Sequence, residues 1–190
     1  KKENAYPAHI AYYDKEHPLK DVFNFKGKIA SFNAETITRA PHLLELISSE
    51  NILNIVQKHL GCYPTLFDLN LLFSFGATEA YHETHHYHRD HDDFHHVLLM
   101  VYLSDVDEDC GGHVYVKGSH GTDNHSSTLK PKIAQNNIVT DIYSDEDTFQ
   151  NELVLGGAGT AFLTDANGLH SGSVPNFGKQ SLSVKLLISL

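Results

Sequence analysis

The chain has 190 residues, and its 41% hydrophobic, 10% aromatic and 20% charged residues are typical of a globular protein rather than a disordered or fibrous one. Its 24 acidic and 14 basic residues give a formal net charge of −10, which would repel a phosphate backbone and argues against nucleic acid as a partner. No apolar run approaches the roughly 20 residues needed to span a bilayer, so we expect no membrane partner and one globular domain over residues 1–190.

The first third of the chain predicts a helical flank. Residues 1–39 show little periodicity and suggest only short strands such as Val22 to Phe25. Pro41 and the leucines that follow favour a short helix, and Ser49 caps a second one whose apolar residues recur at helical spacing until Gly61 ends it. We expect these two helices to cover one face of a sheet.

Strands dominate the rest of the chain. They are expected at Leu66 to Phe75, Val97 to Leu103, His113 to Lys117, Leu153 to Leu155, Thr160 to Leu163 and Leu182 to Leu190. Three glycines between the fourth and the fifth predict a strand, turn and strand pair. The polar stretch from His120 to Asn151 predicts loops and a candidate lid.

Helices followed by many short strands indicate a mainly β fold, a jelly roll with a helical flank. Within the single domain, residues 1–64 would form the N-terminal extension and flanking helices. Residues 65–190 would form the jelly-roll core.

The unusual feature of the composition is its 15 histidines, of which seven lie between positions 82 and 96. Within this run His88 and Asp90 are two residues apart, so on a strand both side chains point to the same side and can bind one ion. A second imidazole from another strand would complete a two-histidine, one-carboxylate set, which leaves neighbouring coordination positions open on Fe(II). His170, which follows the strand and turn at 160–167, is the best candidate.

Simpler interpretations of this region remain open. His91 and Asp93 repeat the pattern in another register, and a histidine-rich surface that sequesters zinc or binds metals nonspecifically would have the same composition. Gly118 to His120 is interpreted as a structural turn. The other histidines of the run are interpreted as solvated or as neighbours of the ligands, namely His85, His86, His95 and His96.

A wider set of segments occurs together in one order. The segments are His88 to Phe94, Val101 to Asp107, Gly111 to His120, Gly157 to Asp165 and Gly168 to Gly172. With them, about two-thirds of the chain resembles the core of the phytanoyl-CoA dioxygenase family. The resemblance implies a cupin-like double-stranded β-helix that uses Fe(II) and 2-oxoglutarate. It also implies that His88, Asp90 and His170 are the metal ligands, and that His91 and Asp93 are not.

The co-substrate site departs from the family pattern. Members of the family usually place an arginine on the strand after the distal histidine, where it binds the far carboxylate of 2-oxoglutarate. The only arginines of this chain are Arg39 and Arg89, which lie elsewhere. Lys179 and Gln180 stand closest to the expected position, and Lys185 lies deeper in the strand. Solvent-facing polar residues on an edge strand are an equally good interpretation of all three.

The resemblance implies a dioxygenase that hydroxylates an aliphatic C–H bond of a small or carrier-linked organic substrate with Fe(II), 2-oxoglutarate and O2. Related halogenases lack the carboxylate ligand, so Asp90 favours hydroxylation. Two alternatives remain: a metal-binding jelly-roll protein without 2-oxoglutarate turnover, and a cupin-like metalloenzyme. The two cysteines, Cys62 and Cys110, are too few for a disulfide framework and indicate a reducing compartment, the cytoplasm. The sequence predicts neither the substrate nor the oligomeric state.

Overall fold

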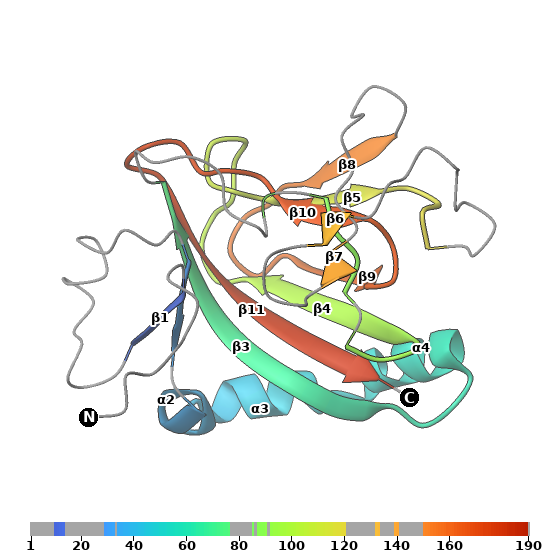
Figure 1. The fold of residues 1–190 in the computed structure, drawn as a ribbon. Helices are drawn as coiled ribbons and strands as arrows, with labels where there is room; N and C mark the ends of the chain where they lie inside the picture. Colours follow the sequence, from blue (N-terminus) through green and yellow to red (C-terminus); the bar gives the residue numbers. More distant parts are fainter. Residues whose placement is uncertain are drawn as a thin grey trace.

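Two facing β-sheets form the body of the computed structural model, which describes residues 10–13, 29–32, 34–76, 85, 87–90, 92–120, 132–133, 139–140 and 150–189. The large sheet has the strand order β1-β2-β3-β11-β4-β9, a smaller one has the order β10-β5-β8, and β6 pairs with β7. Figure 1 shows the small sheet on one side of the large sheet and the helices on the other.

The strands are β1 (Ile10–Tyr13), β2 (Ile29–Phe32), β3 (Thr65–Phe75), β4 (His96–Tyr102), β5 (His113–Val116), β6 (Lys132–Ile133), β7 (Val139–Thr140), β8 (Asn151–Val154), β9 (Ala161–Asp165), β10 (His170–Gly172) and β11 (Gln180–Ser189). The two larger sheets have the jelly-roll arrangement that the sequence predicts, with helices at the flank. The strand β2 pairs with β3, so a segment of the N-terminal region extends the large sheet.

The helical flank consists of α2 (Ala34–Thr38), α3 (Pro41–Ile47) and α4 (Glu50–Leu60), which confirms the two expected helices. Gly61 ends α4 in the left-handed conformation, with φ of 77°, and its N–H binds the carbonyl of Gln57. Ser49 occupies the N-cap position of α4, but its side chain makes no capping hydrogen bond, so the predicted cap is wrong in that detail. Glu50 in the first turn supplies a favourable negative charge instead.

The alternation of side chains along β11 separates the core from the cavity. Val184, Leu186 and Ile188 point toward the helices, and Ser183 and Lys185 point to the opposite side of the sheet. The main hydrophobic cluster joins both helices to the two central strands and consists of Ile47, Val56, Leu60, Val97, Leu99, Val101, Val184, Leu186 and Ile188. The two expected helices therefore cover one face of the sheet, as the sequence predicts.

The expected strand pair around the glycines at 156–159 is wrong. The first strand, β8, pairs with β5 in the small sheet, and the second, β9, pairs with β4 in the large sheet. The segment between them crosses from one sheet to the other, where Gly156 exchanges main-chain hydrogen bonds with Val106. The glycines between two apolar runs indicate a turn but not the partners of the flanking strands, so the local pattern does not show that the two strands belong to different sheets.

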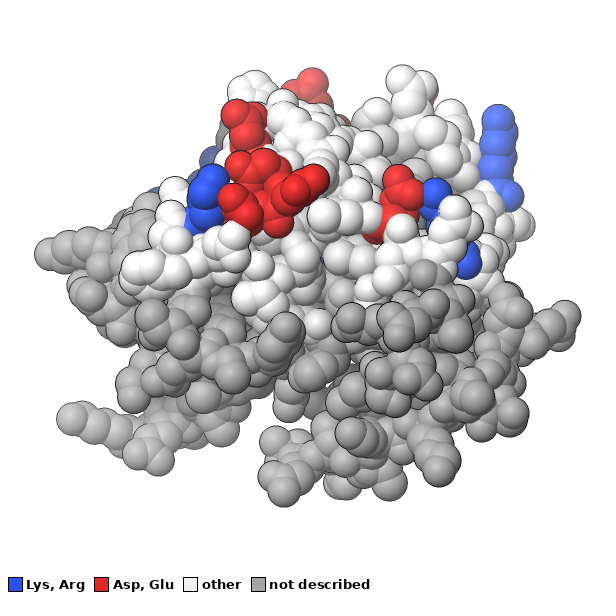
Figure 2. Space-filling view, turned by 90° about the horizontal axis from the view of Figure 1, so that it is seen from above, with Lys and Arg blue, Asp and Glu red and all other residues white. Residues whose placement is uncertain are grey.

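Two other expectations fall on parts of the chain that are not described. The expected strand at Val22 to Phe25 lies outside the described residues, and so does most of the stretch from His120 to Asn151, apart from β6 and β7. Among the described residues, no helix is both long and apolar enough to cross a membrane. Over the described part of the face in Figure 2, the basic side chains are few and scattered, several of them beside acidic ones, and they form no basic stripe.

Candidate metal centre

Main-chain pairing brings the three predicted ligands together. His88 and His170 exchange backbone hydrogen bonds of 2.9 and 3.0 Å, and the N–H of Asp90 donates to the carbonyl of Ala166 at 3.1 Å. The Nε2 atom of His88 lies 3.6 Å from Oδ1 of Asp90, and Nε2 of His170 lies 3.5 Å from Oδ2. One ligand atom from each residue lies within 4.8 Å of the others, so a single ion can contact all three.

The tautomer of His170 suits a metal ligand. Its Nδ1 lies 2.9 Å from the carbonyl oxygen of Gly168, which can only accept, so Nδ1 carries the proton and donates. Nε2 is then left with its lone pair directed at Asp90. The residue is only 3% exposed, so this nitrogen is out of reach of solvent, and it has no hydrogen-bond partner. An unpaired buried acceptor of this kind is costly unless something binds it, and a cation fits that requirement.

Asp90 is held in its charged form. Burial alone would raise the pKa of its carboxyl, but the His170 ring when protonated, the ammonium of Lys185 and the His88 ring when protonated outweigh burial and hold the pKa well below its usual range. The Nζ of Lys185 lies 3.4 Å from Oδ2 of Asp90. The donor set is therefore two imidazole nitrogens and one carboxylate oxygen, which fits non-heme Fe(II).

The segment that contains His88 and Asp90 and the segment that contains His170 are both hydrogen-bonded to the turn at Ser119. Arg89 is buried, and its guanidinium donates to the carbonyl oxygens of Ser119, at 2.7 Å, and of Asn167. The Ser119 hydroxyl accepts the N–H of Leu169 at 2.7 Å and donates to the carbonyl of Val116. Ser119 thus anchors the segment of His88 and the segment of His170 at once, and the turn that contains it is structural, as expected.

A cavity lies between the two sheets beside the ligands. It has a volume of about 120 Å³, several times the ~10–15 Å³ that a cavity needs to hold one water molecule, so a small molecule fits. The large sheet contributes apolar and hydroxyl side chains, and the small sheet contributes His113 and His170. The residues that matter below are Leu98, Met100, Ser181, Ser183, Lys185 and His113.

The predicted co-substrate residues lie in different environments. Lys179 is exposed, and its Nζ lies 3.3 Å from Asp107 and 4.0 Å from Asp109. Gln180 is also exposed, at the start of β11, and neither residue lines the cavity. Lys185, five residues further along the strand, does line it.

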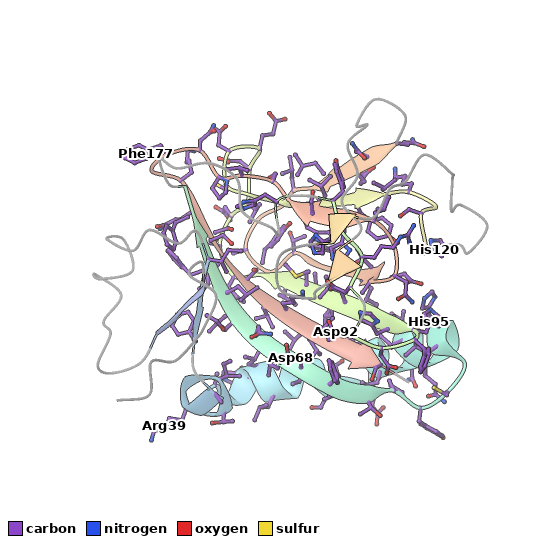
Figure 3. The ribbon with its side chains drawn as sticks, in the orientation of Figure 1. Arg39, Asp68, Asp92, His95, His120 and Phe177 are labelled. Carbon is purple, nitrogen blue, oxygen red and sulfur yellow. The ribbon has the colours of Figure 1, made fainter. Side chains whose placement is uncertain are left out.

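Neither arginine lies at the cavity. The guanidinium of Arg89 is committed to the carbonyls described above, and Arg39 lies beside the helices, on the far side of the large sheet from the small one (Figure 3). Among the described residues that line the cavity, the cationic side chain is therefore Lys185.

Sequence reasoning missed one histidine of the cavity. His113 lines the cavity at the start of β5, its Nε2 is buried without a partner, and burial together with the charges of His170 and Lys185 lowers its pKa to about 3, which keeps the ring neutral. The sequence signal that could have identified His113 is its position directly after Gly111-Gly112. His96, the first residue of β4, is 0% exposed, and its ring lies within 4.8 Å of the Asp90 carboxylate, so of its two interpretations the neighbour of a ligand is confirmed and the solvated residue is not.

Two other described members of the histidine run, His85 and His95, are more exposed than His96. His85 lines the cavity, and His95 lies near the surface within contact of Asp165. His86 and the alternative ligand His91 lie outside the described residues.

Comparison with solved structures shows the same fold in several other proteins. The chain is similar to AviO1 from Streptomyces viridochromogenes Tue57, with a TM-score of 0.58, 15% identity, and coverage of 86% of this chain and 66% of that one. It is similar to the α-ketoglutarate-dependent epimerase SnoN of nogalamycin biosynthesis, with a TM-score of 0.60, 17% identity, and coverage of 85% and 61%.

A third similar structure is EctD from S. alaskensis, which contains 2-oxoglutarate and 5-hydroxyectoine, with a TM-score of 0.62, 14% identity, and coverage of 93% and 61%. The chain therefore spans less than two-thirds of each of these three proteins. No curated protein sequence matches it.

The family comparison is more direct, because the sequence profile described as phytanoyl-CoA dioxygenase (PhyH) matches residues 4–181. This match includes the two segments that hold His88, Asp90 and His170. The chain therefore belongs to the phytanoyl-CoA dioxygenase family.

Proposed function

We propose that this protein is an Fe(II)- and 2-oxoglutarate-dependent dioxygenase in which His88, Asp90 and His170 bind the iron. The observation that carries the proposal is the buried, unpartnered Nε2 of His170, whose tautomer is fixed by Gly168 and which faces an ionised carboxylate. Membership of the family and the likeness to EctD and SnoN, both solved with the co-substrate, support the same assignment.

The bound iron would supply the oxidising chemistry, in which O2 and 2-oxoglutarate are consumed and succinate and CO2 are formed. The chain itself fixes the ligands and shapes the cavity. Asp90 acts as a ligand and not as a base, because its two oxygens face the Nε2 atoms of His88 and His170, the other two residues of the donor set. Leu98 and Met100 give the cavity an apolar wall that limits the entry of water.

Hydroxylation of an aliphatic C–H bond is the reaction we assign to this site. The carboxylate ligand is present, whereas related halogenases lack it to leave room for chloride. The likeness to the epimerase SnoN makes removal of hydrogen without oxygen insertion the second candidate. The two outcomes differ in product mass, because hydroxylation adds one oxygen atom and epimerisation adds none.

For the co-substrate, Lys185 is the best-placed cation to bind the far carboxylate of 2-oxoglutarate. It lies on the same face of β11 as Ser181 and Ser183, and all three line the cavity that His88 and His170 share. Lys179 and Gln180 are the second candidate pair, because they lie at the position along the strand where relatives have arginine. Their exposure and the pairing of Lys179 with Asp107 weigh against them.

The test is an anaerobic titration of the protein with Fe(II) and then 2-oxoglutarate. We expect the weak visible charge-transfer band of an iron-bound 2-oxo acid, followed by succinate when oxygen is admitted. His88→Ala and Asp90→Ala should abolish the band, and His91→Ala should retain it. A band that persists without Asp90, or that disappears with His91, would overturn the ligand assignment.

A further inference from the structure

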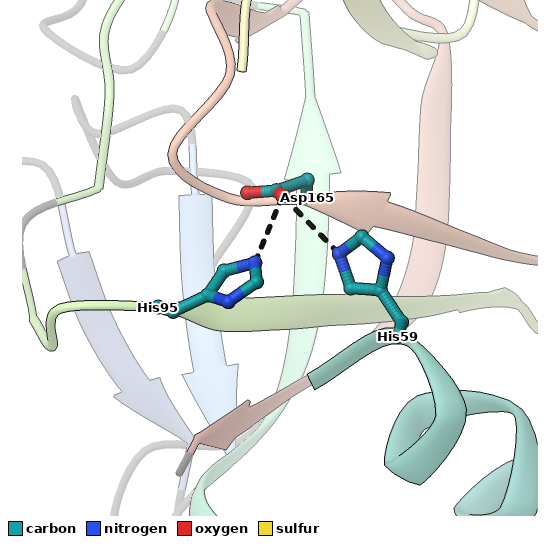
Figure 4. A group of neighbouring side chains, drawn as sticks. All are labelled: His59, His95 and Asp165. Atoms are coloured by element: carbon teal, nitrogen blue, oxygen red, sulfur yellow. Dashed lines mark hydrogen bonds and ion pairs between the residues drawn. The ribbon is translucent and has the colours of Figure 1, made fainter. Parts of the chain in front are cut away.

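A second group of metal-type side chains lies outside the cavity. His59 in the last turn of α4, His95 just before β4 and Asp165 at the end of β9 converge from three separate elements. Figure 4 shows both imidazoles directed at the one carboxylate. The strand residue opposite Asp165 is Val97, whose side chain packs with the helices, so this group lies on the helical side of the large sheet.

The distances suit a small divalent ion. Nε2 of His59 and Nε2 of His95 each lie 3.2 Å from Oδ2 of Asp165, and the ligand atoms of all three residues lie within 4.8 Å of one another. In a tetrahedral zinc site with bonds of about 2.0–2.1 Å, neighbouring ligand atoms are about 3.3 Å apart. The two separations from Asp165 are close to those of a zinc tetrahedron, and the third, between the two imidazoles, is no more than 4.8 Å.

The carboxylate is held in place for this role. The side chain of Asp165 is only 9% exposed, and its Oδ1 accepts the N–H of Asn167 at 3.0 Å, which leaves Oδ2 to face the histidines. Among the described residues, no lysine or arginine forms an ion pair with this carboxylate. A buried carboxylate needs a positive partner, and an imidazole supplies one only when it is protonated. A divalent ion supplies that charge without requiring protonation.

The ligand types favour zinc over the hard cations. Two imidazoles with one carboxylate suit zinc and its neighbours in the first transition row, whereas calcium and magnesium require oxygen ligands throughout. Three protein ligands leave a fourth position for water, as in zinc sites that are open. That position faces solvent, because the side chains of His59 and His95 are 45% and 34% exposed.

We propose that His59, His95 and Asp165 form a second divalent-metal site, which favours zinc over calcium and magnesium and pins α4 to the edge of the large sheet. The proposal does not depend on the activity assigned to the cavity. The two sites are joined through the chain, since Asp165 and Asn167 begin the turn that ends at His170. Zinc at the outer site would therefore also restrain the segment that holds one ligand of the inner site.

The experiment measures zinc stoichiometry on the full chain after chelation, with His59→Asn combined with His95→Asn, and with Asp90→Asn in a separate variant. Wild type should bind two equivalents, and each variant should lose one of them. The matched control is His42→Asn, an exposed helical histidine beside Glu45, which should retain both. Zinc should raise the thermal unfolding midpoint of the Asp90→Asn variant, which keeps the outer site. In the double histidine variant the part of the rise that comes from the outer site should be lost.

The outcomes separate the two sites. If the double histidine variant still binds as much zinc as wild type, or if Asp90→Asn removes all zinc, the outer site does not exist, and the short distances are hydrogen bonds only. If Asp90→Asn loses no zinc while the histidine variant loses one equivalent, the outer site holds and the cavity assignment fails. Asp165→Asn keeps the acceptor for Asn167 and removes only the charge, so it repeats the test without loss of the turn.

Discussion

Lys185 is the residue on which co-substrate binding depends in our assignment. A hydrogen bond to a charged group contributes roughly 1.5–3 kcal/mol, and its loss weakens binding by about 10- to 150-fold. We therefore expect Lys185→Met to raise the dissociation constant of 2-oxoglutarate by that factor, as measured by titration of the charge-transfer band at saturating Fe(II). Saturating iron matters because Lys185 also contacts Asp90.

The matched control for that change is Lys179→Met, which removes the same charge from an exposed position. Its effect on 2-oxoglutarate binding should be less than about twofold, because an exposed pair such as Lys179 with Asp107 contributes little. A large effect of Lys179→Met with none of Lys185→Met would reverse the assignment. It would return the role to the residues that the sequence favoured.

The contrast between these lysines shows how far sequence reasoning reaches for single residues. The spacing of His88 and Asp90 selected two residues that the structure does bring together, although the expected strand there is only an isolated bridge between His88 and His170. The choice between Lys179 and Lys185 required knowledge of where β11 begins. Lys179 lies in the turn just before the strand, whereas Lys185 lies within it, on the face that lines the cavity. His113 was missed because its cavity-facing position depends on a sheet partner remote in sequence.

The turn from Asp165 to His170 is the element that positions His170, the proposed distal ligand. Gly168 provides the carbonyl that fixes the His170 tautomer, and a Cβ at this position would collide with the hydroxyl and ring of Tyr115. Because that ring is held by a hydrogen bond to the carbonyl of Asp165, it cannot move aside freely. The turn would have to shift instead.

We therefore predict that Gly168→Ala lowers Fe(II) affinity by at least about tenfold and destabilises the fold by ~1–3 kcal/mol, the usual range for overpacking. Equilibrium Fe(II) binding and urea unfolding measure the two effects. Gly157→Ala is the matched control, because a Cβ there meets only one atom, at an ordinary 3.4 Å. Equal behaviour of the two variants would show that Tyr115 does not constrain the turn.

Helices and strands that are defined by local sequence signals could be predicted, but the pairing of strands with one another could not. The helices α3 and α4 follow from Pro41, the helical spacing of apolar residues and Gly61, all of which act within a few residues. The strand β8 was found as a strand, but its partner was not, because its pairing with β5 depends on residues about 40 positions earlier. Local turn chemistry therefore predicted a hairpin where the chain changes sheets.

For the whole molecule, the fold class followed from helices preceding many short strands, while the contact that joins the sheets did not. Tyr102 on β4 is only 1% exposed, and its hydroxyl donates to the carbonyl of Val154 at 2.9 Å and accepts the N–H of His113 at 3.0 Å. One side chain of the large sheet thus satisfies main-chain groups on two strands of the small sheet, beside the cavity.

Tyr102→Phe would leave the ring in place and remove both hydrogen bonds. Two buried main-chain groups would then lack a partner, at a cost of about 1–3 kcal/mol in the free energy of unfolding. Urea unfolding should show this loss with an unchanged slope, since the surface exposed on unfolding stays the same. Tyr63→Phe, at an 84% exposed position, should have no measurable effect. If both variants unfold at the same urea concentration, the Tyr102 hydroxyl does not hold the two sheets together, and the cavity between them depends on apolar packing alone.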